Sequence, residues 1–287
     1  MHVDETVDAD LARRCWLPLE ILHVVPYWAP ETQQAYTALD LQFWQGYVAS
    51  RAGGMGRVGP AAVVPAFYVW APRLVEAAVP SAWERVGPEE VVAARYAAAG
   101  AALHRLLDEV ADPAEVAEAA ALAGTAGEGL RGSPRALYLA AATAPEPADP
   151  LTALWHAATL LREHRGDGHV AVLQALGVAP VEALLLNTTR EGAAREAMRS
   201  RRAWPRQDWD AAVRSLQGRG LLDAEGTLTA DGAALRAEVE TRTDALAVAG
   251  WQHLGAEGSA RLLELTAPWR EALLSSGALP DWQRERR

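Results

Sequence analysis

The sequence predicts a mainly α-helical protein with one small β-hairpin near its C-terminal end. Alanine dominates and runs of β-branched residues are few, which favours helices over strands. Proline and glycine interrupt the helical patterns and mark the breaks between them. The hairpin is indicated by "GRGLLDAEGTLTADG" at 218–232, where Glu225-Gly226 suits a tight turn between two short apolar stretches.

The composition is that of a globular protein with one large or two ordinary domains in 287 residues. No uncharged apolar stretch is long enough to cross a bilayer, and the acidic start "MHVDETVDAD" is unlike a signal peptide, so we expect a cytoplasmic protein. Cys15 is the only cysteine, which excludes an internal disulfide and a multi-cysteine zinc site. The absence of lysine excludes Schiff-base and Walker-type chemistry.

The first half of the chain predicts helices separated by proline and glycine turns. Pro18 should kink or split the first helix. The expected elements are a helix at 8–25, an aromatic-rich helix at 31–49, a glycine loop, a turn-broken apolar pair at 61–80, a helix at 89–109, and a helix plus linker at 112–149. The linker "ATAPEPADP" at 142–150 is the best domain boundary, which predicts domains at 1–145 and 150–287.

The second half predicts shorter helices followed by the hairpin. We expect helices at 151–163, 170–176, 180–187, 192–202 and 208–217. Gly220 is suited to the left-handed end of the last of these helices, and Thr229 is suited to cap the helix that follows the hairpin.

Residues from about 170 to 245 resemble the C-terminal half of a MarR-type winged helix, on the strength of "RGLLDAEGTLTADG". With "FWQGYVASRAGGMGRVG", "FYVWAPRLVEAAVPSAW" and "LWHAATLLREHRGDGHV", most of the chain resembles an actinobacterial helix-turn-helix (SalAI-like) family. The resemblance implies a winged helix-turn-helix with 192–202 as positioning helix, 208–217 as recognition helix and the hairpin as wing. A faint similarity between 38–54 and 175–192 leaves open a tandem pseudo-repeat, with the N-terminal domain a degenerate winged helix.

A basic segment gives this chain of net charge −10 one region suited to DNA. Residues 190–220 hold eight arginines against four carboxylates. On the winged-helix resemblance, Arg214, Ser215 and Gln217 would face base edges, and the phosphate contacts would come from Arg201, Arg202, Arg206 and Arg219. Asp208 and Asp210 oppose this interpretation, because they begin the recognition helix and repel phosphate. A winged helix kept only as a scaffold is the alternative.

A polar constellation accompanies "HRGDGHVAVLQALG" at 164–177. Glu20 and His23 share one helix face, as do His156 and Glu163. If these helices pack together, acid–base chemistry would use Glu20, His23, His156, Glu163, His164 and Asp167. Aromatic and polar neighbours would form a ligand pocket of Tyr27, Trp28, Phe43, Trp44, Tyr47, Arg51, Tyr68, Trp70 and His169. Residues 164–169 are equally well explained as a helix joint with its caps.

The leading hypothesis is a helix-turn-helix protein that binds a small hydrophobic or aromatic ligand and acts as a transcriptional regulator or regulator-like sensor. The rival is an enzyme of specialised metabolism that uses the His, Glu and Asp pocket for acid–base or metal-assisted chemistry. No spacing matches a recognised metal site, and the sequence names no cofactor. DNA is an expected partner of the first hypothesis, a membrane is not, and a homodimer is left open.

Overall fold

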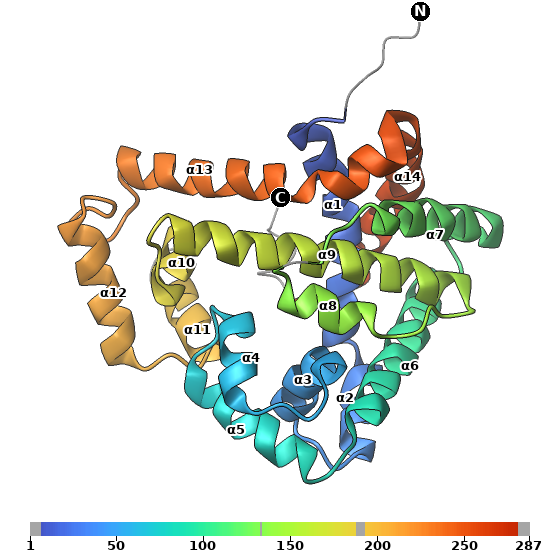
Figure 1. Cartoon of the computed structure of the whole chain (residues 1–287), viewed down its shortest axis with the longest axis horizontal. Coiled ribbons are helices and arrows are strands. Elements are labelled where there is room, and N and C mark those ends of the chain that lie inside the picture. The colour runs from blue at the N-terminus through green and yellow to red at the C-terminus, as the bar shows by residue number, and fades with distance from the viewer. Residues whose placement is uncertain (1–6, 133, 188–192, 281–287) are drawn as a thin grey trace, which may run out of the picture.

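The computed structural model describes residues 7–132, 134–187 and 193–280 and is helical over most of them (Figure 1). Seven helices begin at a proline, where the missing N–H is no loss and φ is already helical. The α-helices are α1 (Ala9–Val24), α2 (Pro30–Ala38), α3 (Phe43–Ala52), α4 (Pro60–Phe67), α5 (Pro72–Trp83), α6 (Pro88–Leu107), α7 (Pro113–Glu128), α8 (Ala136–Ala142), α9 (Pro150–Ala175), α10 (Pro180–Asn187), α11 (Ala193–Arg201), α12 (Arg206–Gly218), α13 (Ala230–Ala247) and α14 (Ala249–Ser275); two 3-10 turns are η1 (Val25–Trp28) and η2 (Gly53–Met55).

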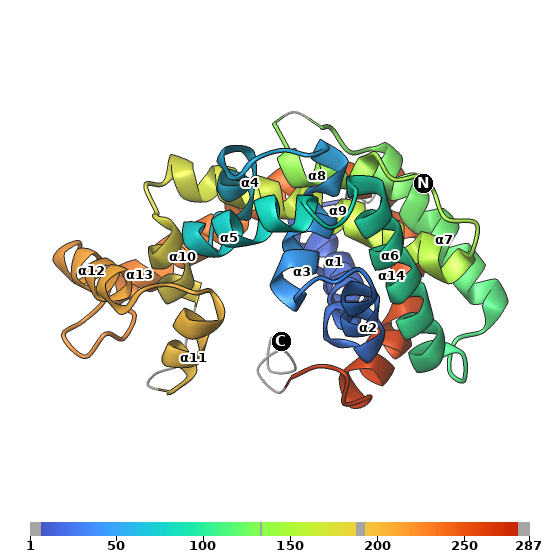
Figure 2. The ribbon, with the colours of Figure 1, turned by 90° about the horizontal axis from the view of Figure 1, so that it is seen from below.

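The long helix α9 runs through the middle of the molecule and packs against α1, α6, α7, α8 and α13 (Figure 1). Its first half, including Leu154 and Trp155, belongs to a core shared with α1, α6, α7 and α14. Its last turns, through Val172 and Leu173, join a second core with α10, α12 and α13. A third core lies among α2 to α5 around the fully buried Tyr36. Viewed from below, α10 to α13 lie at one end and α6, α7 and α14 at the other (Figure 2).

The predicted β-hairpin wing is wrong. Among the described residues there is no strand, and the segment between α12 and α13 contains only one isolated antiparallel bridge, Leu222 with Leu228. The Asp223 carboxylate accepts the Thr227 N–H at 2.7 Å, which closes the turn after a single backbone pair. The expected end of α12 and the expected start of α13 are confirmed: Gly220, just after α12, has φ +71°, and the Thr229 hydroxyl caps α13.

The predicted helix joint at 164–169 is also wrong, because α9 continues unbroken through both glycines. Gly168 is required for close approach rather than for a turn. A Cβ there would lie 2.5 Å from Nη1 of Arg135, whose guanidinium donates to the carbonyls of His164 and Leu246. Asp167 caps another helix instead of its own, since its carboxylate accepts the Tyr138 N–H of α8 at 3.0 Å.

Two helix boundaries near the N-terminal end differ from expectation. Pro18 lies inside α1 without splitting it. The single helix predicted at 31–49 is two helices, α2 and α3, separated at 39–42 where Asp40 has φ +55°. No single described helix is long and apolar enough to cross a membrane; only α9 and α10 taken together, across a bend of 106°, meet that test.

Candidate functional site

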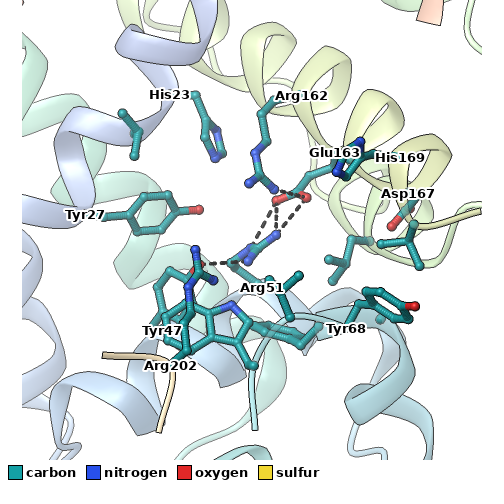
Figure 3. Close-up of a pocket in the computed structure, with 18 of the residues that line it drawn as sticks. His23, Tyr27, Tyr47, Arg51, Tyr68, Arg162, Glu163, Asp167, His169 and Arg202 are labelled. Carbon is teal, nitrogen blue, oxygen red and sulfur yellow. Dashed lines mark hydrogen bonds and ion pairs between the residues drawn. The ribbon is translucent and has the colours of Figure 1, made fainter. Parts of the chain in front are cut away.

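A cavity of about 220 Å³ lies where α1, α3 and α9 meet the turn after α4 and the end of α11 (Figure 3). A cavity of about 150 Å³ holds benzene, so this one has room for one or two aromatic rings. The nine residues predicted for a ligand pocket all line it, although their role in binding remains a prediction; they are Tyr27, Trp28, Phe43, Trp44, Tyr47, Arg51, Tyr68, Trp70 and His169.

One wall of the cavity is a chain of aromatic rings. Trp70 lies edge to face with Trp44 at 4.9 Å between ring centroids and 5.5 Å from Tyr47. Tyr47 in turn lies 5.2 Å from Tyr27, and Phe67 closes the wall beneath the Arg51 guanidinium at 4.9 Å. Such a wall favours a planar apolar ligand, because rings pack on one another in offset or edge-to-face geometry.

The charged centre of the cavity is Glu163, which is 2% exposed. Nη2 of Arg51 donates to both of its carboxylate oxygens, at 2.7 and 2.8 Å, and Nη1 of Arg162 donates to one of them at 2.7 Å. Burial alone raises the pKa of Glu163, but the guanidinium groups of Arg162 and Arg51 outweigh it and hold that pKa well below its usual range. Glu163 is therefore an ionised anchor for two arginines rather than a base near neutral pH.

His23 is 2% exposed and presents a lone pair to the cavity. The Thr159 hydroxyl donates its only proton to the Trp155 carbonyl at 2.8 Å, so its oxygen must accept from Nδ1 of His23 at 2.9 Å. Burial lowers the pKa of His23 well below its usual value, which keeps the ring neutral. Its Nε2 is then unprotonated, has no hydrogen-bond partner among the described residues, and belongs to a ring that faces the cavity (Figure 3).

Two phenol hydroxyls face the same space. Tyr27 accepts a hydrogen bond from Arg95, and Tyr47 accepts one from Nη1 of Arg51 at 2.9 Å. Each oxygen is occupied by an arginine donor, and neither O–H proton has an acceptor among the described residues. Burial raises the pKa of Tyr27, so its proton is retained. Both phenols are free to donate into the cavity.

The six residues predicted for catalysis do not all converge. Glu20, His23, Glu163 and Asp167 line the cavity, whereas His156 and His164 lie outside it. Nδ1 of His156 is 2.6 Å from the Tyr96 hydroxyl of α6, and His164 packs against the ring of Tyr138. Seven residues of helix rise by about 10 Å, which carries His156 away from Glu163 although both lie on one face.

The predicted positioning and recognition helices are α11 and α12, joined by residues 202–205. Gly192, the expected first residue of the positioning helix, lies outside the described residues. Trp209 and Leu216 attach α12 to the second core, and α12 lies at the edge of the molecule (Figure 1). Its exposed face carries Gln207, Asp210 and Arg214.

The residues predicted for DNA contact fall into three groups. Arg206 and Arg214 are exposed on α12, although Arg206 also pairs with Glu196 at 2.8 Å. Arg201 and Arg202 line the cavity. The remaining three make intramolecular bonds: Ser215 and Arg219 donate to Glu182, and Gln217 donates to the carbonyls of Asp223 and Ala224. Within the described residues, no group of three His, Cys, Asp or Glu side chains is arranged to hold a metal.

A helix-turn-helix family model matches residues 12–280. The chain belongs to this helix-turn-helix family. No curated protein and no solved structure matches it. Membership supports a DNA-binding, regulator-like role in general terms. The match does not confirm the resemblance to the MarR type or to the actinobacterial SalAI-like group. The match covers the helices that form the cavity as well as α11 and α12, so the family model includes both regions.

In this helix-turn-helix protein the cavity wall and the turn between α11 and α12 are joined directly. The Arg202 guanidinium lies 4.1 Å from the centroid of Trp70. The Ala71 N–H donates to the Arg202 carbonyl at 3.0 Å, and the Trp204 indole N–H donates to the Val69 carbonyl at 2.9 Å. The two four-residue turns, 68–71 and 202–205, are therefore in direct contact.

Sequence reasoning missed Arg162 and the contact of Arg202 with the cavity wall. Arg162 was not singled out, yet it bonds Glu163 and lies 3.5 Å from Glu20. The signal was available, because two carboxylates facing an apolar interior require a buried cation nearby. The winged-helix resemblance and the local charge predict a phosphate contact for Arg202, whereas its stacking on Trp70 depends on a segment more than one hundred residues away.

Proposed function

We propose that this protein binds DNA through α12 and that a small aromatic ligand in the cavity changes its affinity for DNA. It would act as a ligand-responsive transcriptional regulator in the cytoplasm. The observation that carries the proposal is the shared position of Trp70, which lines the cavity and stacks on Arg202 in the turn before α12. A ligand that packs on the aromatic wall must contact or displace this ring.

The connection between the two turns is suited to transmit such a displacement. Besides the two bonds described above, Arg73 donates to the Ala203 carbonyl at 2.6 Å. Tyr68 and Ala203 have φ of +27° and +59°, which is strained backbone for residues other than glycine. Bonds from Ala71, Arg73 and Trp204 join the two segments in which these strained residues lie, so moving Trp70 relaxes or shifts the turn that orients α12. Coupling of this kind typically changes affinity by about 5- to 150-fold.

The DNA-binding half of the proposal is tested by selecting bound duplexes from a random-sequence library and measuring their affinity by fluorescence anisotropy. We expect salt-dependent binding that Arg214→Ala weakens, with a salt slope smaller by about one. Arg14→Ala is the matched control, because Arg14 is exposed on α1, far along the chain from α12. Failure to select any duplex at low salt would overturn this half.

The ligand half is tested with one- and two-ring aromatic compounds that raise the melting temperature. Compounds that bind should change the affinity for the selected duplex in the wild type. In Arg202→Ala they should still bind but lose most of this effect, because the stacking contact with Trp70 is gone. Binding without any change in DNA affinity would refute the regulatory proposal.

We do not extend the proposal to an enzyme. Glu163 is held as an ionised anchor by two arginines, and two of the three histidines in the predicted catalytic set lie outside the cavity. The features that remain, an acceptor nitrogen and two phenol donors beside an aromatic wall, are sufficient for recognition and do not by themselves define a reaction.

A further inference from the structure

The polar atoms that face the cavity define a hydrogen-bonding pattern that its ligand must match. Nε2 of His23 is an acceptor without a partner among the described residues, and the residue is only 2% exposed. The hydroxyls of Tyr27 and Tyr47 are donors whose protons have no acceptor among the described residues. A buried polar group left without a partner costs free energy, so a ligand gains by satisfying these three atoms.

A single hydroxyl group matches this pattern. It donates one hydrogen bond and accepts up to two, whereas a carboxylate cannot donate and an amide N–H cannot accept at the same atom. The rings of His23 and Tyr27 lie 5.3 Å apart and those of Tyr27 and Tyr47 lie 5.2 Å apart, so the three polar side chains form one continuous group. Figure 3 shows His23 and Tyr27 facing the same space above Arg51.

The surroundings favour a hydroxyl on an aromatic ring over an aliphatic one. The wall formed by Phe43, Trp44, Tyr47 and Trp70 suits a planar ring. Four arginines and three carboxylates line the cavity, namely Arg51, Arg162, Arg201 and Arg202 with Glu20, Glu163 and Asp167. This balance favours the partial negative charge that a phenolic oxygen carries when its proton is donated to His23.

We propose that the ligand is a phenol of one or two rings, whose hydroxyl donates to Nε2 of His23 and accepts from Tyr27 and Tyr47. The hydroxyl lies at the inner end of the cavity, and the ring lies against the aromatic wall beside Trp70. This inference rests on the proposed ligand-binding function, of which it specifies the ligand class. His23 is here a recognition residue that touches the ligand.

The test compares 2-naphthol with 2-fluoronaphthalene, which is similar in size but has no donor proton. Binding to the full chain is measured by calorimetry at neutral pH without DNA. We expect wild-type protein to bind 2-naphthol at least about tenfold more tightly, the value of one net hydrogen bond. In His23→Asn, whose amide can still donate to Thr159, the preference should fall to a few fold, the part due to the two tyrosines, while 2-fluoronaphthalene binds as before. Tyr47→Phe should weaken 2-naphthol alone, by a few fold.

A control and a second readout separate recognition from folding. His156→Asn replaces another buried histidine, which lies outside the cavity, and should leave the preference unchanged. The 15N resonance of His23 Nε2 should have the shift of an unprotonated nitrogen in the free protein and should move when 2-naphthol is added. Equal binding of the two probes, an unchanged preference in His23→Asn, or no binding of 2-naphthol below millimolar concentration would each overturn the phenol assignment.

These outcomes differ from failure of the regulatory proposal. If both probes bind equally, the cavity still binds aromatic ligands and only the phenol assignment is lost. If 2-naphthol binds through His23 but leaves the affinity for DNA unchanged, the phenol assignment stands and the regulatory proposal fails.

Discussion

Replacing Glu163 with glutamine removes one negative charge from the interior without changing the shape of the side chain. The carboxylate accepts three hydrogen bonds from Arg51 and one from Arg162, and its side chain is 3% exposed. A glutamine amide keeps one oxygen but places an NH₂ group against arginine donors. About two charge-assisted bonds are therefore lost, each with a value of about 1.5–3 kcal/mol.

We expect Glu163→Gln to lower the free energy of unfolding by about 3–5 kcal/mol, the usual cost of leaving a buried charge without its partner. A chain of 287 residues has an unfolding entropy of about 0.6 kcal/mol/K, so the melting temperature should fall by about 5–8 °C. Thermal and urea denaturation followed by circular dichroism at 222 nm measure both quantities.

Arg51→Met supplies the matched double-mutant cycle. With both changes, Arg162 keeps an opposite charge beside it, because it lies 3.5 Å from Glu20. The double variant should therefore be more stable than the sum of the two single losses by about 2 kcal/mol. If Glu163→Gln lies within about 1 kcal/mol of the wild type, or the two losses simply add, the cluster is not the ionised anchor inferred here.

Two further predictions concern α9. Burial raises the pKa of Asp167 to about 6, so between about pH 4 and 6 the folded protein holds a proton that the unfolded chain has released, and stability falls as pH rises through this window. Asp167→Asn keeps an acceptor for the Tyr138 N–H. Between pH 5 and 7 the variant should lose about 1 kcal/mol less of its free energy of unfolding than the wild type, as measured by urea denaturation at both pH values. Equal losses in the two proteins would contradict this prediction. Gly168→Ala should destabilise the protein by about 1–2 kcal/mol, because its Cβ would lie 2.5 Å from Arg135 and displace the guanidinium. Gly166→Ala, two residues away in the same helix, should be neutral or stabilising by up to about 1 kcal/mol, since its Cβ would meet Arg162 only at 3.6 Å; equal effects of the two changes on the melting temperature would refute the close-packing role of Gly168.

The helical fold and most of the cavity wall were accessible from local sequence. Prolines mark the starts of seven of the described helices because their preference is local, and aromatic residues such as Phe43 and Tyr47 occur where helical spacing directs them inward. The orientation of His156 was not accessible, because its partner Tyr96 is sixty residues away on another helix.

The errors share a physical cause. Gly166 and Gly168 are typical of a helix end, but here Gly168 makes room for Arg135, and nothing near it in sequence records that contact. The turn residues, the short apolar stretches beside them and the winged-helix resemblance predict a wing, whereas the Asp223 side chain closes the turn before a second pair of strand residues can form. In both cases a side-chain contact decides the local structure: Arg135 packs against Gly168, and Asp223 accepts a backbone N–H that a strand partner would otherwise bind. Local propensity predicts neither contact.

The unbroken course of α9 also determines how the chain can be divided. Its first half contributes Leu151, Leu154, Trp155 and Leu161 to a core whose other walls are α1, α6, α7 and α14, while its end belongs to the core under α12. A fragment cut at the linker and starting at residue 150 would lose α1, α6 and α7 and expose to water the side chains that these helices cover. The end of the molecule that carries α12 is thus attached through α9 to the N-terminal helices, and isolating it for study would require replacing the contacts that those helices make with α9.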